Sequence, residues 1–155
     1  MGHYQLFTTQ KIPASVTEVW DFISSPQNLR KITPEHMGFD ITSTKLADKM
    51  YPGMIISYKV KPLLGIGLDW VTEITHVKEG EYFVDEQRIG PYSIWHHQHR
   101  ISPIKNGVLM EDIVTYQPPL GILGDLANAL FIRKQLKDIF QYRHQAVEKE
   151  FGTFQ

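Results

Sequence analysis

The sequence predicts an α+β fold in which one antiparallel sheet of about seven strands packs against a long C-terminal helix. Two observations support this prediction. Apolar and polar residues alternate with period two over most of residues 39–117, as they do in strands that bury one face. From about Asp125 to Phe151, apolar residues instead recur at helical spacing. Because a sheet of this kind must bury one face, the helix is the element expected to cover it.

The chain begins with a strand and two short helices. Residues 4–11 alternate in polarity and are soon followed by a proline, which predicts the first strand. Ser15 and Glu18 have the Ser-x-x-Glu spacing of a capping box, so a helix is expected to begin here. The Ser-Pro pair at 25–26 ends this helix, and residues 28–32 are expected to form another helical turn.

Further strands follow through short links that contain Gly, Pro or Asn. Because the links are short, strands that are neighbours in sequence are expected to be antiparallel neighbours in space. The expected strands span residues 39–45, 54–61, 68–77, 81–89, 92–102 and 108–117.

A long amphipathic helix is expected from about Asp125 to Phe151, after a Pro-Pro pair that ends the sheet. At about 1.5 Å per residue it would measure about 40 Å, which is enough to cross the whole sheet. Its polar side is expected to carry Lys134, Lys137, Asp138, Arg143 and Glu148, and its buried stripe Leu126, Leu130, Leu136, Phe140 and Val147.

Composition narrows the possible functions. The length of 155 residues suits one domain, so residues 1–155 are expected to form a single domain. A net charge of −1 leaves no basic excess for binding nucleic acid. The chain has no cysteine, which excludes disulfides and thiolate chemistry and fits a cytoplasmic location. It also shows no secretory signal and no apolar run long enough for stable membrane insertion.

Several polar side chains are expected on the inner face of the sheet. On residues 92–102, the face with Trp95, His97, His99 and Ile101 has the larger apolar ends, so we place it inward. An even-length link to the next strand then pairs odd residues with even ones, which brings His97 and His99 to the side of Asp112 and Tyr116. A four-residue link would set His99 directly opposite Asp112, whereas a two-residue link would make them diagonal neighbours.

The same alternation favours Phe83, Asp85, Gln87 and Ile89 on the inner face of the preceding strand, if an odd-length link joins the two strands. The strand before that is expected to add Trp70, Thr72 and Ile74. The complete set of expected ligand-binding residues is Trp70, Phe83, Asp85, Gln87, Trp95, His97, His99, Asp112, Val114 and Tyr116.

This polar inner face has more than one interpretation. A histidine that faces a carboxylate can simply satisfy two buried polar groups. Mostly apolar walls with a few convergent polar groups are typical of a small-molecule pocket. His99 and Asp112 could also act as an acid/base pair, although no nucleophile or second catalytic element accompanies them.

Metal and nucleotide sites are less well supported. The His97-x-His99 spacing is similar to the His-x-His of cupins, but Pro103 and Ile104 stand where a glutamate would follow. No metal site is therefore expected. The Gly65-Ile66-Gly67 stretch is too short for a dinucleotide fingerprint, and no cofactor is expected. The four other histidines that lie outside this region are expected in solvent: His3, His36, His76 and His144.

Nearly the whole chain resembles the START/polyketide cyclase-like (SRPBCC) superfamily. The segment PASVTEVWDFISSPQNLRKITP is similar to the first helix pair of that family. The segments FVDEQRIGPYSIWHHQHRI and MEDIVTYQPPLGILG are similar to a bacterial subgroup, whose members also occur fused to NAD-dependent epimerase-like domains. No such domain is present here, so we expect the stand-alone form.

The resemblance implies a helix-grip fold, in which a curved antiparallel sheet wraps around the long C-terminal helix and encloses a cavity. The subgroup's DEQ, WxHxH and Asp-x-x-x-Tyr positions correspond to Asp85, Gln87, Trp95, His97, His99, Asp112 and Tyr116.

We therefore expect the protein to bind a small hydrophobic, aromatic or lipid-like molecule, with the polar residues orienting its polar end. Two alternatives remain open. One is an enzyme of the cyclase or dehydratase type that uses His99 with Asp112. The other is an accessory module for a partner enzyme. The expected partners are thus a small hydrophobic molecule and possibly an enzyme, and not nucleic acid.

Overall fold

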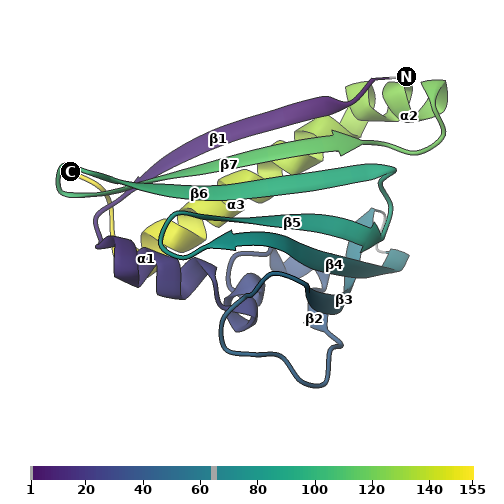
Figure 1. Cartoon of the computed structure of the whole chain (residues 1–155). Helices are drawn as coiled ribbons and strands as arrows, with labels where there is room; N and C mark the ends of the chain where they lie inside the picture. The colour runs from purple at the N-terminus through teal and green to yellow at the C-terminus, as the bar shows by residue number, and fades with distance from the viewer. Residues whose placement is uncertain (1, 64–65) are drawn as a thin grey trace.

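The computed structural model describes residues 2–63 and 66–155, so Gly65 of the Gly65-Ile66-Gly67 stretch lies outside the described residues. These residues form one seven-stranded antiparallel sheet that wraps around a long C-terminal helix (Figure 1). The predicted α+β helix-grip fold is therefore confirmed. The strands run in the order β1-β7-β6-β5-β4-β3-β2 across the sheet, so each pair from β2 to β7 is adjacent in both sequence and space.

The elements follow the predicted order, with small differences at their ends. Their bounds are β1 Tyr4–Ile12, α1 Val16–Ile23, η1 Pro26–Arg30, η2 Glu35–Met37, β2 Asp40–Ile41, β3 Met54–Leu63, β4 Ile66–Lys78, β5 Tyr82–Ile89, β6 Ile94–Ile104, β7 Gly107–Gln117, α2 Ile122–Ala127, η3 Asn128–Ile132 and α3 Arg133–Phe151.

The predicted capping box holds the start of α1. The backbone N–H of Glu18 donates to Ser15 Oγ at 3.3 Å, and the backbone N–H of Ser15 donates to Glu18 Oε2 at 2.8 Å. These reciprocal bonds satisfy two donors that a helix start leaves without partners. The buried side of α1 includes Trp20, whose ring contacts Phe83 of β5 edge-on at 6.2 Å between centroids. The cap fixes where α1 begins, and the Trp20–Phe83 contact packs the helix against the sheet.

The strand expected over residues 39–45 is reduced to the two residues of β2, so that prediction was too long. The reason is local hydrogen bonding. Ser43 Oγ accepts from the backbone N–H of Ser57 at 2.8 Å, where a strand would present a carbonyl group. Thr42 and Ser43 both donate their backbone N–H to the Ser57 carbonyl. A serine side chain that competes with the backbone in this way ends the ladder after two residue pairs.

The C-terminal helical segment runs from Ile122 to Phe151, which is 30 residues, and so begins three residues before the predicted start. Leu136, Phe140 and Val147 are buried as predicted. The prediction that Leu126 and Leu130 are buried was wrong, since they are 56% and 65% exposed.

The π-helical turn η3 explains why the buried stripe of this helix is shorter than predicted. A π turn inserts one extra residue per turn, so the stripe on one side of it does not continue in register on the other. The segment before it lies at the end of the molecule that holds the N-terminus (Figure 1), where Tyr4 donates its hydroxyl to Asp125 Oδ1 at 2.9 Å.

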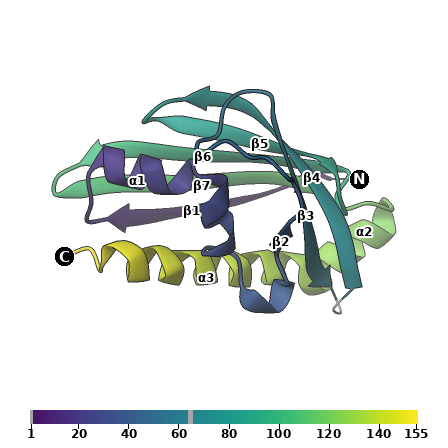
Figure 2. The same ribbon diagram turned by 90° about the horizontal axis from the view of Figure 1, so that it is seen from below.

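The middle of α3 is attached to the first strand. Thr8 Oγ1 lies 3.0 Å from His144 Nε2, and Gln10 donates its side-chain N–H to the His144 carbonyl at 2.9 Å. His144 was predicted to lie in solvent, which is wrong, because this contact leaves it half-buried. Burial also lowers the pKa of His144. Figure 2 shows the resulting arrangement, in which α3 runs along the open side of the curved sheet.

None of the helices among the described residues is both long and apolar enough to cross a membrane.

Candidate ligand-binding site

The register of β6 and β7 brings His99 directly opposite Asp112, as the even-length link required. The last pair of this hairpin is Ile104 with Gly107, so only two residues form the link. The prediction that a two-residue link would make His99 and Asp112 diagonal neighbours was wrong. A four-residue link over 104–107 and a two-residue link over 105–106 give the same register. The shorter link only adds the pair Ile104–Gly107 to the end of the ladder.

The register of β5 and β6 sets Phe83 opposite His99 and Asp85 opposite His97. Both residues of β5 therefore point inward as predicted. Ile89, predicted inward, is instead 58% exposed. A register shift between β4 and β5 pairs Ile89 with Val71, which lies on the opposite face from Trp70 and Thr72. The side chain of Ile89 consequently turns outward.

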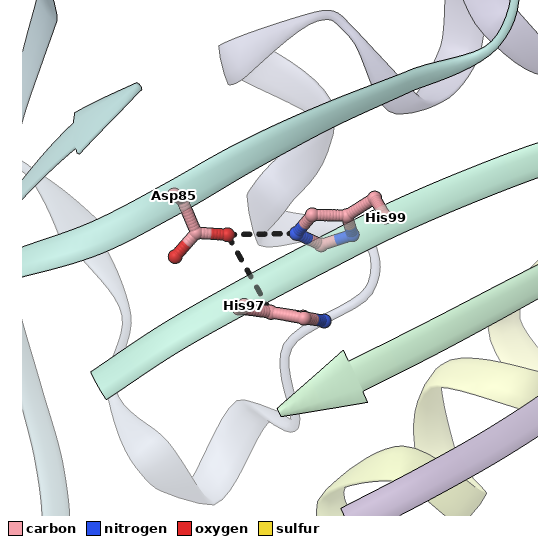
Figure 3. Close-up of side chains that lie close together, drawn as sticks. All are labelled: Asp85, His97 and His99. Carbon is pink, nitrogen blue, oxygen red and sulfur yellow. Dashed lines mark hydrogen bonds and ion pairs between the residues drawn. The ribbon is translucent and has the colours of Figure 1, made fainter. Parts of the chain in front are cut away.

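Two histidines and two carboxylates form a closed, buried cluster, of which Figure 3 shows Asp85, His97 and His99. Asp85 Oδ2 lies 2.7 Å from His99 Nε2 and 3.4 Å from His97 Nδ1. Asp112 Oδ1 lies 2.8 Å from His97 Nε2 and 3.0 Å from His99 Nδ1. Each histidine therefore bridges both carboxylates through its two ring nitrogens. We call Asp85, His97, His99 and Asp112 the His–Asp cluster.

The two histidines differ in protonation. Burial lowers the pKa of His97 to about 4, and the positive charge of His99 adds to this effect. For His99, burial alone would lower the pKa, but its hydrogen bonds to Asp112 and Asp85 outweigh it and raise the pKa. His99 is therefore the histidine of the cluster whose charged form is favoured, and in that form its two ring nitrogens donate to Asp85 and Asp112. We assign the single proton of His97 to Nε2, because its contact with Asp112 is the shorter one.

The carboxylates of the cluster stay ionised. Burial by itself would raise the pKa of Asp112, but hydrogen bonds from His97 and His99 hold it well below the usual range. The pKa of Asp85 is also lowered, since the neighbouring histidines and Arg143 outweigh the effect of burial. The two carboxylates thus carry two negative charges beside the two histidines, and the guanidinium of Arg143 lies 3.6 Å from Asp112.

A cavity of about 120 Å³ lies between the inner face of the sheet, the segment that joins α1 to β3, and α3. Its polar end consists of Asp85, His97 and His99 of the cluster, with Arg143 from α3. The rest of its wall is mainly apolar and includes the aromatic residues Phe39, Tyr58, Trp70, Phe83, Tyr92, Trp95 and Phe140.

The aromatic part of the wall is held by ring contacts and hydrogen bonds. Trp70 meets Trp95 edge-on at 5.3 Å between centroids and stacks on Tyr58 at 6.1 Å. Trp70 also donates its indole N–H to Thr72 Oγ1 at 3.1 Å, and the Tyr58 hydroxyl lies 3.0 Å from the same oxygen. These bonds satisfy the polar atoms of the two large rings, so the surface that they offer to the cavity is apolar.

The structure brings six of the ten predicted ligand-binding residues to the cavity: Trp70, Phe83, Asp85, Trp95, His97 and His99. Asp112 lies behind the histidines, where it reaches a second, much smaller cavity. Gln87 is used in the link after β5, where it accepts from the Tyr92 backbone N–H and donates to the Tyr92 carbonyl. Val114 and Tyr116 pack with Leu136 and Phe140 of α3.

Sequence reasoning missed Arg143 as a cavity residue, because it was placed on the polar side of the C-terminal helix. Its side chain is only 13% exposed. A signal was available in the spacing. Arg143 follows Phe140 by three residues and precedes Val147 by four, so it lies beside the buried stripe. Tyr58 and Tyr92 were also missed, and both lie next to a predicted wall residue, Trp70.

Asp85, His97 and His99 also deserve consideration as metal ligands, since one donor atom from each lies within 4.8 Å of the others. All four ring nitrogens of the two histidines, however, lie within 3.4 Å of a carboxylate oxygen of the cluster. A metal ion would have to replace at least two of these contacts and displace the protons on those nitrogens. We derive no metal chemistry from this arrangement.

Comparison with known proteins places the fold in context. The family described as a domain of unknown function, DUF8410, matches residues 10–151. A comparison with curated proteins finds no match.

Several solved structures are similar over almost their entire length. A START superfamily protein from Mycobacterium smegmatis has a TM-score of 0.70 and 13% identity, with 97% of each chain covered. The KanY protein has a TM-score of 0.70 and 18% identity, with 97% of this chain and 99% of KanY covered. A major latex-like protein from Panax ginseng has a TM-score of 0.67 and 9% identity, with 96% and 97% covered.

At these identities the similarity concerns the fold. The predicted resemblance to the START/polyketide cyclase-like superfamily is confirmed at that level. The predicted relation to a bacterial subgroup with epimerase-like fusions stays a prediction.

Proposed function

The chain belongs to the DUF8410 family, whose function is unknown, and we propose that it binds a small, mostly apolar molecule in the cavity between the sheet and α3. The observation that carries this proposal is the cavity itself, whose wall combines aromatic residues with Asp85, His97 and His99 of the cluster and with Arg143. Apolar walls with a few convergent polar groups are the usual composition of a small-molecule site.

The size of the cavity favours a small ligand. Pockets that hold drug-sized molecules measure roughly 300–1,000 Å³, whereas this cavity measures about 120 Å³. An apolar cavity of about 150 Å³ is known to hold benzene. A molecule with a single ring or a short alkyl chain therefore matches the space available, with its apolar part against Trp70 and Trp95 and its polar end at the cluster.

The cluster supports binding better than catalysis. A general base needs a free nitrogen within hydrogen-bond reach of the substrate. Both ring nitrogens of His99 are already engaged, by Asp85 at 2.7 Å and by Asp112 at 3.0 Å. The cyclase or dehydratase alternative therefore has no specific observation in its favour, and an accessory role for a partner enzyme stays a prediction.

Tryptophan fluorescence can test the proposal, because Trp70 and Trp95 line the cavity. The probe is p-cresol, a single ring with one polar group. We expect saturable quenching or a spectral shift of the wild-type protein, and a retained small molecule in native mass spectra of protein purified without organic solvent.

A variant that fills the cavity gives the decisive comparison. Ile139 lines the cavity from α3, so Ile139→Trp should abolish binding of p-cresol. Ile132 lies on the same helical segment but packs in the cluster around Val114, outside the cavity, so Ile132→Trp is the matched control and should retain binding. If p-cresol does not bind, or if Ile139→Trp binds it as well as the wild type does, the proposed function is wrong.

A further inference from the structure

Arg143 brings to the cavity a positive charge whose hydrogen-bonding capacity is largely unused. Its guanidinium stacks on the ring of Phe140, with Cζ 4.9 Å from the ring centroid. Its Nε and Nη1 atoms are fully buried and have no hydrogen-bond partner among the described residues. The carboxylate oxygen of Asp112 lies 3.6 Å from Nη1, which is beyond hydrogen-bond distance.

The carboxylates of the His–Asp cluster accept no hydrogen bond from Nε or Nη1 of Arg143, and one oxygen of each is already engaged by both histidines. Asp112 Oδ1 lies 2.8 Å from His97 and 3.0 Å from His99. Asp85 Oδ2 makes the corresponding contacts on the other side, as the dashed lines in Figure 3 show. The cluster is closed on itself, and the arginine beside it is left with donors that have no acceptor.

A buried, charged donor without an acceptor is unfavourable, so an acceptor that enters with a ligand is stabilising. Nε and Nη1 lie on different edges of the planar guanidinium, so each edge offers at least one unused N–H group. A carboxylate matches such an edge in both geometry and charge, whereas an amide or an alcohol matches it less well.

Arg143 carries the only fixed positive charge among the described residues that line the cavity. The lining residues also include one carboxylate, Asp85, and the imidazole of His99. Asp112 does not line this cavity, since it lies behind the histidines. Because Asp112 Oδ1 still lies 3.6 Å from Arg143 Nη1, it offsets part of the arginine's charge, so the hydrogen bonds that Nε and Nη1 can donate, rather than net charge, favour an anionic group here.

We propose that the ligand of this cavity is a small carboxylate with an aromatic ring or a short alkyl chain, whose anionic group pairs with Arg143. This inference rests on the proposed binding function and specifies the class of ligand. The apolar part of the molecule packs against Trp70 and Trp95, and the cavity volume of about 120 Å³ restricts it to about one ring.

Benzoate and benzamide form a matched pair of probes, because they have almost the same shape and differ in charge. Isothermal titration calorimetry at pH 7 should show benzoate binding at least about 10-fold more tightly than benzamide. Arg143→Met keeps the packing on Phe140 and removes the donors. This variant should bind benzoate about 10- to 100-fold more weakly than the wild type and should bind benzamide with nearly unchanged affinity. Arg133→Met, on the exposed side of the same helix, is the control and should bind benzoate like the wild type.

Folding of each variant is checked by circular dichroism. If Arg143→Met does not fold, Arg143→Lys is used in its place. Lysine keeps the positive charge but lacks the planar guanidinium edge, so benzoate should still bind at least several-fold more weakly. Equal affinities of the wild type for benzoate and benzamide, or an unchanged benzoate affinity without the arginine, would overturn the inference while the binding function stands. Failure of both probes and of p-cresol would overturn both.

Discussion

His97 should make the protein less stable as the pH falls from 6.5 to 4. Burial lowers the pKa of this histidine from 6.5 to about 4. Between these two values the unfolded chain binds a proton at His97 that the folded chain does not bind. Stability therefore rises with pH across this interval and is lost as the pH falls through it. Replacing His97 with a group that does not titrate should remove this part of the pH dependence.

The size of the effect follows from the pKa difference. Each pH unit between about 4 and 6.5 contributes about 1.4 kcal/mol, so His97 accounts for about 3 kcal/mol of unfolding free energy. This is a large fraction of the ~5–15 kcal/mol that stabilises a typical domain. His99 acts in the opposite sense at higher pH. Its pKa is raised, so its contribution to stability is present below pH 6.5 and is lost as the pH rises through the folded-state pKa.

Urea unfolding at pH 6.5, 5.5, 4.5 and 4 provides the assay, with His97→Gln as the variant. The glutamine can still donate to Asp112 as His97 Nε2 does at 2.8 Å, but it does not titrate. Between pH 6.5 and 4, the free energy of unfolding of the wild type should fall by about 3 kcal/mol more than that of the variant. His76→Gln, on the exposed part of β4, is the control and should keep the wild-type slope. Parallel slopes for the wild type and His97→Gln would refute the reasoning, as would an NMR titration of His97 at or above pH 6.5.

Four further substitutions have expected costs in the free energy of unfolding, measured in urea at pH 7. Asp112→Asn removes the negative charge that holds His99 and lies near Arg143, so it should cost about 3–5 kcal/mol; a loss below 1 kcal/mol would mean that the cluster is not tightly coupled. Leu136→Ala should cost about 2–5 kcal/mol because Leu136 is buried. Leu126→Ala should change the free energy of unfolding by no more than about 0.5 kcal/mol, because Leu126 is exposed. Similar costs for the two leucine substitutions would contradict the burial pattern of this helix. Ser15→Ala breaks the capping box and should cost about 1 kcal/mol, with a proportionate fall in the melting temperature.

The local features of this fold could be predicted from the sequence because they depend on near neighbours. Alternation located the strands, and the spacing of Ser15 and Glu18 located the start of α1. The parity of the β6–β7 link was enough to place His99 and Asp112 on one face, since side-chain direction in a strand has a period of two. The same local logic failed at Ile89, where a register shift between β4 and β5 reversed the face.

The resemblance to the START/polyketide cyclase-like superfamily added the wrapping of the sheet around the helix, which alternation alone does not determine. It did not identify which residues reach the cavity. Gln87 matches the resemblance but is used in a turn, and Tyr58 lines the cavity without matching it.

By itself, therefore, the sequence determined the order of the elements, the inner face of β6 and β7, and the concentration of histidines and carboxylates on that face. Only the tertiary structure decided how these groups are paired and what remains unpaired. The closed pairing of the His–Asp cluster depends on side chains from three strands, β5, β6 and β7, whose polar atoms approach to about 3 Å. The unused donors of Arg143 depend on the rotation of α3 against the sheet. Such contacts join residues far apart in the chain, and no local pattern encodes the distance between them.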